Sequence, residues 1–159
     1  PTALFVRLSR DSVNDDSLVA WLTNQLRTHR VEPARVVFQV AEVVAAEHLR
    51  KTIAIKAALQ KLGFRFAIES IGTGRDSEGQ IGHLRPDFVK IDGSLMQGLA
   101  ADQQKQKLVR NLVDAARESG AVTIGERVED ANTMAVLWQL GVEFIQGYFV
   151  NAPEEVVLG

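Results

Sequence analysis

The sequence contains no cysteine, and this absence excludes disulfides, thiolate catalysis and cysteine-based zinc sites. The three histidines, His29, His48 and His83, form no recognisable metal-ligand spacing, so we interpret them as ordinary surface or core-edge residues. No apolar run is long enough to cross a bilayer, and the first residues show no signal-peptide pattern. We therefore expect a cytoplasmic protein without membrane insertion.

A strong charge of either sign is also absent, because the net charge is only −2. This balance predicts no general attraction to DNA, RNA or an anionic membrane. What the chain does have is apolar material: 46% of its 159 residues are hydrophobic, which is enough for one domain with a real core. We expect a single domain over residues 1–159.

Short apolar runs alternate with helical patterns along the chain. The runs that predict strands are 4–8, 36–41, 64–68, 88–91, 122–124 and 144–149. The segments with helical spacing are 15–29, 45–62, 102–119 and 132–140, and the last three each end just before a glycine. Strand, helix, glycine and strand in this order are typical of βα units around a parallel sheet.

The number of strands predicts only part of a βα barrel. No dinucleotide fingerprint accompanies the βα pattern, and a closed eight-stranded barrel takes about 250 residues. The chain also begins inside an apparent strand, at PTALFVRLS. We therefore expect an α/β fold of the TIM-like (β/α) barrel type that lacks its N-terminal strands. A doubly wound sheet is the alternative.

Polar residues follow nearly every predicted strand. In parallel βα folds the carboxyl ends of the strands form the functional site, so these side chains are expected to converge. They are Arg7, Gln39, Glu42, Glu69, Ser70, Lys90, Asp92, Glu126, Glu129, Gln146 and Tyr148.

Four segments resemble motifs of the EAL domain family, whose enzymes hydrolyse the bacterial messenger cyclic di-GMP. Residues 69–74, ESIGTG, resemble the family's DDFGTG turn, and residues 89–92, VKID, resemble its LKID strand. Residues 123–129, TIGERVE, resemble VVAEGVE, and residues 146–149, QGYF, resemble its QGY ending. The EAL tripeptide lies upstream on the first barrel strand of the family. The resemblance thus implies an EAL-type barrel, here without its N-terminal strands.

The residues that match the family's metal ligands are largely changed. Arg7 stands at the asparagine of VN-x-S, Gln39 at the first glutamate of L-E-x-T-E, and Glu69 with Ser70 at the aspartate pair. Hard divalent cations need anionic oxygens, and two cations would be needed to activate water and stabilise the leaving oxygen. An arginine stays protonated and offers no acceptor atom. The resemblance therefore predicts no metal and no catalysis.

Three remnants of the catalytic set remain in this sequence, namely Lys90, Glu126 and the lengthened acid Glu69. Without metals, Arg7 could neutralise a phosphate directly through a charge-assisted hydrogen bond. We therefore expect a cyclic di-GMP receptor that uses no cofactor. Its expected nucleotide contacts are Arg7, Glu126, Gln146, Tyr148 and Phe149.

The Gly72–Gly74 loop is the part of the family's site that couples to dimerisation, and the resemblance assigns its anchoring to Glu129. The ending of the chain and its altered ligands are most similar to degenerate EAL receptor domains of FimX-like regulators of type IV pili and twitching motility. This similarity implies a PilZ-domain adaptor as partner and further domains in a larger chain.

Two other functions are open from the sequence alone. One is a weak phosphodiesterase that uses Glu42, Glu69 and Glu126 with Mg²⁺ or Mn²⁺. The other is a nucleotide-independent protein-docking module, including the case of a drifted remnant that binds no nucleotide.

Overall fold

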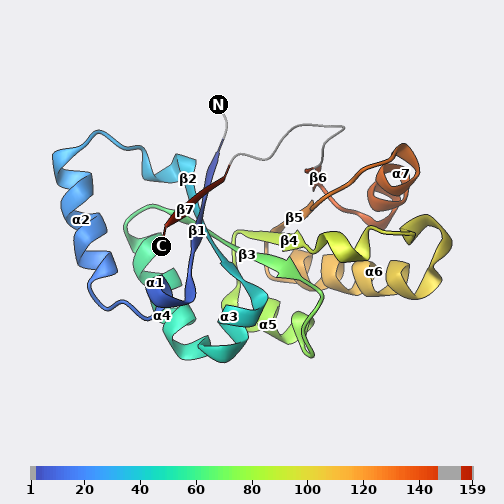
Figure 1. Cartoon of the computed structure of the whole chain (residues 1–159), viewed down its shortest axis with the longest axis horizontal. Helices are drawn as coiled ribbons and strands as arrows, with labels where there is room; N and C mark the ends of the chain where they lie inside the picture. Colours follow the sequence, from blue (N-terminus) through green and yellow to red (C-terminus); the bar gives the residue numbers. More distant parts are fainter. Residues whose placement is uncertain (1–2, 147–154, 159) are drawn as a thin grey trace.

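The computed structural model describes residues 3–146 and 155–158 (Figure 1). In these residues seven parallel strands form one sheet in the order β6-β5-β4-β3-β2-β1-β7. The strands are β1 (Leu4–Leu8), β2 (Val36–Ala41), β3 (Arg65–Ile71), β4 (Phe88–Ile91), β5 (Val122–Gly125), β6 (Phe144–Ile145) and β7 (Glu155–Leu158). The predicted α/β class with a parallel sheet is confirmed.

Apart from shifts of one residue at the start of β3 and the end of β5, the strand predictions agree closely with the sheet, with two larger differences. β3 continues to Ile71, beyond the predicted end at residue 68. β7, at residues 155–158, was not predicted, and it pairs in parallel with β1. The predicted strand 144–149 is represented by β6, and its residues 147–149 lie outside the described part of the chain.

The helices connect the strands in the expected βα manner. They are α1 (Arg10–Val13), α2 (Leu18–Thr28), α3 (Glu42–Glu47), α4 (Leu49–Lys61), α5 (Ser77–Leu84), α6 (Gln103–Glu118) and α7 (Ala131–Leu140). Three single 3₁₀ turns are η1 (Pro33–Arg35), η2 (Gly93–Leu95) and η3 (Leu99–Ala101). The segment predicted as one helix over 45–62 is two helices, because His48 interrupts it with φ −130° and ψ 52°.

Aspartate caps set the starts of three helices. Asp76, Asp102 and Asp130 each accept a hydrogen bond from the backbone N–H three residues further on, at the beginning of α5, α6 and α7. An aspartate at this position satisfies a backbone donor that the helix itself leaves unpaired. The α5 start is therefore encoded locally, although its short apolar pattern did not predict a helix.

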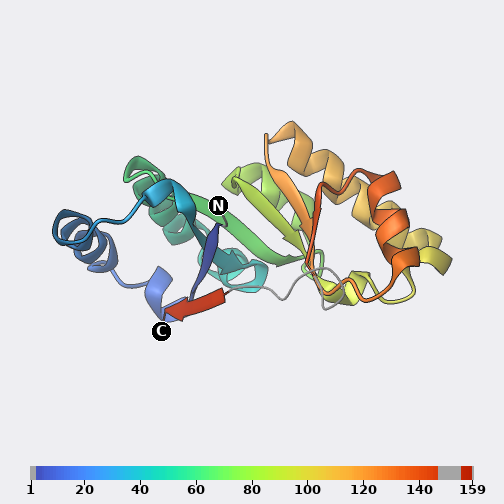
Figure 2. The same ribbon diagram turned by 90° about the horizontal axis from the view of Figure 1, so that it is seen from above.

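The main core lies between the sheet and the helices, where Figure 1 shows α4, α5 and α6 beneath the strands. Strand residues such as Phe38, Phe66 and Ile68 belong to this core. The opposite face carries a second, smaller cluster that includes Phe5 and Val37. Both faces of the strands are thus buried, as is typical of parallel sheets. Figure 2 shows the same layers from above.

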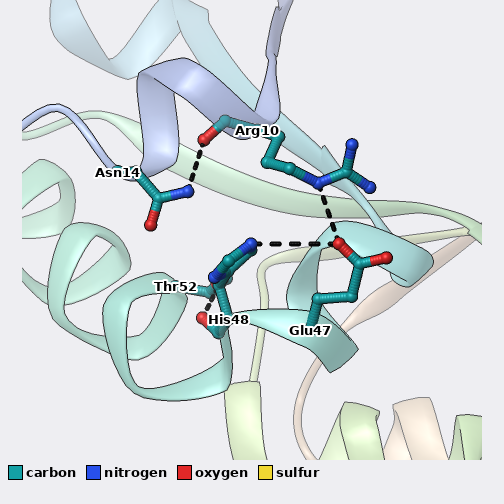
Figure 3. A network of polar contacts seen from close by, with 5 residues as sticks. All are labelled: Arg10, Asn14, Glu47, His48 and Thr52. Atoms are coloured by element: carbon teal, nitrogen blue, oxygen red, sulfur yellow. Dashed lines mark hydrogen bonds and ion pairs between the residues drawn. The ribbon is translucent and has the colours of Figure 1, made fainter.

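A polar network joins α1 to the α3–α4 junction (Figure 3). Arg10 Nε donates to Glu47 Oε2 at 2.8 Å, and the hydroxyl of Thr52 donates to the carbonyl of His48 at 2.8 Å. Because the Arg10 and Glu47 side chains are about half exposed, water screens this ion pair and it contributes little stability. No helix in the described part of the chain is long and apolar enough to span a bilayer.

Candidate functional site

The sheet register brings the sequence-predicted polar residues to one edge. Arg7 on β1 lies opposite Gln39 on β2, and Glu69 on β3 lies opposite Ala41, two residues further along β2. On the other side, the N–H of Glu126 donates to the carbonyl of Ile91 on β4. Parallel pairing therefore collects these residues along the carboxyl edge, as the βα pattern predicted.

Arg7 and Glu69 form a two-pronged ion pair across the intervening strand β2. Arg7 Nε donates to Glu69 Oε1 at 2.6 Å, and Nη2 donates to Oε2 at 2.9 Å. The fork of the guanidinium matches the two carboxylate oxygens, which makes this geometry specific as well as strong. Glu69 is buried, whereas 41% of the Arg7 side chain is exposed. Both oxygens of Glu69 thus face a permanent cation.

Strand β3 carries an irregularity next to this pair. Its register with β4 shifts between Ile68 and Ile71, and Ser70 has a left-handed φ of 54°. The backbone N–H of Ser70 donates to Glu126 Oε1 at 3.3 Å. The bulge thus connects β3 to the residue that follows β5. No local pattern predicted it, because serine is not a typical left-handed residue.

Glu126 titrates near neutral pH. Burial raises the pKa of its carboxyl from 4.5 to about 7, because a desolvated carboxylate is disfavoured. The hydrogen bond from Ser70 and the charge of Lys90 lower this pKa, while Glu69 and Asp92 add to the increase. Near pH 7 this carboxyl can therefore either donate or accept a hydrogen bond.

Lys90 and Gln39 are fully buried in the floor of the site. The Lys90 ammonium lies 3.9 Å from the centroid of the Phe5 ring, a cation–π arrangement. Phe5 in turn packs edge-on against Phe88. Lys90 is thus held by the aromatic face beneath the strand ends, and its charge acts on Glu126.

The Gly72–Gly74 loop contacts a residue that the sequence analysis did not assign to it. The N–H of Gly74 donates to Glu42 Oε1 at 2.7 Å, and Glu42 is 2% exposed. The sequence indicates Glu42 as a site residue, since it directly follows the predicted strand 36–41. Glu129, the expected anchor, is exposed and lies in a hollow with Arg127. The anchoring role of Glu129 stays a prediction.

Of the three expected contacts near the chain end, Gln146 alone lies within the described residues. Its N–H donates to the carbonyl of Gly125, and its carbonyl accepts from the N–H of Val128. These bonds fix the Gln146 backbone beside the segment that carries Glu126. Tyr148 and Phe149 lie outside the described residues.

The residues at this edge do not fit a centre of two hard cations. Among the described residues, no group of three or more histidine, aspartate or glutamate side chains is arranged to hold a metal ion. Glu69 already faces Arg7, and the amide of Gln39 supplies only a neutral oxygen. Divalent cations of this kind are held by several anionic oxygens at once.

Comparison with known proteins gives consistent results. Residues 1–153 match the model of the EAL domain. The EAL domain of Pseudomonas aeruginosa FimX bound to c-di-GMP superposes with a TM-score of 0.89 at 34% identity, covering 96% of this chain and 63% of that one. The Xanthomonas citri FimX EAL domain in complex with c-diGMP superposes with a TM-score of 0.86 at 30% identity. This match covers 96% of this chain and 60% of that one.

Among curated proteins, the cyclic di-GMP phosphodiesterase PdeB of Shewanella oneidensis is 29% identical over 149 residues. This match covers 94% of the chain but only 17% of the relative, so the chain spans a small part of that much longer protein. The match to the family model, the superpositions and the four motifs agree. The chain belongs to the EAL domain family.

Proposed function

We propose that the chain is a catalytically silent EAL domain that binds cyclic di-GMP as a receptor. The observation that carries this proposal is the Arg7–Glu69 pair, in which a cation faces both oxygens of a carboxylate at a family metal-ligand position. The two FimX EAL domains, whose structures contain c-di-GMP, support the choice of ligand. The ligand is the nucleotide, and no cofactor is required.

The electrostatics at the carboxyl edge of the sheet favour the binding of a phosphodiester without metal ions. Gln39 and Ser70 carry no charge, so two sources of repulsion toward phosphate are absent from these positions. The pair with Glu69 orients the Arg7 guanidinium, and the exposed part of this side chain can donate to a phosphate oxygen. Glu126, Gln146, Tyr148 and Phe149 complete the proposed nucleotide contacts.

Arg7→Ala is expected to weaken cyclic di-GMP binding about 10- to 100-fold, the equivalent of one charge-assisted hydrogen bond of about 1.5–3 kcal/mol. Isothermal titration calorimetry on the folded variant measures this loss. Arg10→Ala is the matched control, because Arg10 is also an arginine paired with a glutamate, but this pair joins α1 to α3 and involves no residue of the sheet (Figure 3). It should bind like the parent protein.

Two calorimetric results would contradict this proposal. No heat from the parent protein would favour the nucleotide-independent docking module. An equal loss in both variants would show that Arg7 makes no specific contact.

Incubation of the parent protein with cyclic di-GMP and Mn²⁺ is expected to give no linear dinucleotide, because the donor set does not fit two cations. The competing function, a weak phosphodiesterase using Glu42, Glu69 and Glu126, draws on relatives such as PdeB. Product that forms in the parent protein and disappears in Glu126→Ala would establish that enzyme and overturn the receptor. Chromatography of the nucleotide is the measurement.

The wider role belongs to the same proposal. We place the receptor in the cytoplasm, as one domain over residues 1–159 of a larger chain that regulates type IV pili and twitching motility. Its signal would pass to a PilZ-domain adaptor. The similarity to FimX EAL domains at 30% and 34% identity supports this choice among the possible outputs.

A further inference from the structure

Arg127 has a backbone conformation that is rare for its residue type. Its φ is 54°, in the left-handed region, which disfavours long side chains and favours glycine. The EAL motif that residues 123–129 resemble has glycine at this position. An arginine held in a strained conformation directly after Glu126 calls for a compensating role of its side chain.

The stem of Arg127 is packed in a fixed place. It lies against Gly93 at the start of η2, where an added Cβ would come within 2.6 Å of Arg127 Cδ and 2.8 Å of its Cβ. Gly93 is buried, whereas Arg127 is exposed. The glycine therefore makes room for the aliphatic stem, and the guanidinium is presented at the surface.

Arg127 lines a hollow of about 210 Å³ beside the candidate site. Three acidic residues also line it, namely Asp92, Glu129 and Asp130. Asp92 accepts from the N–H of Ser94, and Asp130 accepts from that of Thr133, so both cap the elements that follow them. Glu129 is the acid in this hollow that caps no helix start.

A hollow with one cation and three acids repels a phosphate but suits a guanine base. Guanine presents two acceptors, O6 and N7, on one edge, which arginine recognises with two parallel hydrogen bonds. Its neighbouring edge presents the N1 and N2 donors, for which a carboxylate is a suitable acceptor. Adenine has a donor in place of O6 and lacks the N2 amino group.

We infer that Arg127 and Glu129 read one guanine of the nucleotide, with Arg127 on its O6 and N7 atoms and Glu129 on its N1 and N2 hydrogens. This inference rests on the proposed function, and it adds a specificity-determining pair to it. The remaining nucleotide would extend from the hollow past Glu126 toward Arg7.

Arg127→Gly separates binding from stability, because the two should change in opposite directions. Glycine relieves the left-handed backbone, so the melting temperature should rise. Loss of the two hydrogen bonds should weaken the binding of cyclic di-GMP about tenfold. The preference for cyclic di-GMP over cyclic di-AMP should decrease as well. Calorimetry with both dinucleotides and thermal unfolding are the measurements.

The chain offers a matched control in Arg85, which is also an exposed arginine with a left-handed φ, here 46°. It caps the end of α5 before β4 begins, at the opposite edge of the sheet. Arg85→Gly should raise the melting temperature in the same way while both nucleotide affinities stay unchanged. Glu129→Gln should weaken the binding of cyclic di-GMP severalfold and reduce the preference for cyclic di-GMP over cyclic di-AMP.

The outcomes distinguish this inference from the proposed function. If the parent protein binds cyclic di-GMP, and Arg127→Gly keeps both its affinity and its preference, the guanine assignment is wrong and the receptor stands. If the parent protein binds no cyclic di-GMP, both the proposed receptor function and the guanine assignment are wrong.

Discussion

Glu126→Gln is expected to be more stable than the parent protein at pH 8, by up to about 3 kcal/mol. Burial raises the pKa of Glu126 from 4.5 to about 7, so the folded state holds this proton more tightly than the unfolded state does. That contribution to stability is fully present below pH 4.5 and is lost as the pH rises to about 7. The glutamine remains neutral throughout and avoids the loss.

Urea unfolding of both proteins at several values between pH 4.5 and pH 8 measures this effect. The difference in the free energy of unfolding should be small at pH 4.5 and should grow until about pH 7. Glu118→Gln is the control, because Glu118 is exposed at the end of α6 and its replacement should leave the pH dependence nearly as in the parent. Parallel curves for Glu126→Gln and the parent would show that Glu126 is not desolvated.

Gly72→Ala is expected to lower the free energy of unfolding by about 3 kcal/mol, through two effects that add. The φ of Gly72 is +109°, which an alanine adopts only with strain of about 1–2 kcal/mol. The added Cβ would also lie 2.5 Å from Cδ1 of Leu95 and 3.2 Å from Cδ1 of Leu112, and such overpacking costs about 1–3 kcal/mol. Denaturant unfolding measures the sum.

Gly98→Ala isolates the backbone effect. Gly98 also has a positive φ, +68°, but an added Cβ there meets no atom within 4 Å. This variant should lose only about 1 kcal/mol. Equal losses in the two variants would mean that Leu95 and Leu112 move aside, so that the loop is not packed as described. Gly72→Ala should also weaken nucleotide binding, because the distorted loop directly follows Glu69 and Ser70 at the site.

Some features of this protein could be predicted from its sequence because they are local or repeat with a short period. The strands 4–8, 36–41 and 88–91 were predicted with their observed bounds, since an apolar run followed by a helical pattern is visible within a few residues. The placement of the polar residues at one edge follows from parallel pairing. The family follows from four motifs in order.

Other features depended on residues that are distant in the chain. The strand β7 and the left-handed Ser70 have no strong local signal, because each depends on pairing with another strand. The break between α3 and α4 at His48 had no strong local signal either. Glu42 could be recognised as a strand-end acid, but its partner Gly74 lies 32 residues further on.

The sequence by itself determined the order of strands and helices and the chemical type of every residue at the site edge. Only the tertiary structure decided how those residues pair. The sequence analysis did not predict that Arg7 is held by Glu69, 62 residues away, because it is the register of β1, β2 and β3 that brings their side chains together. Pairing of this kind depends on distances across the sheet, which no local pattern contains.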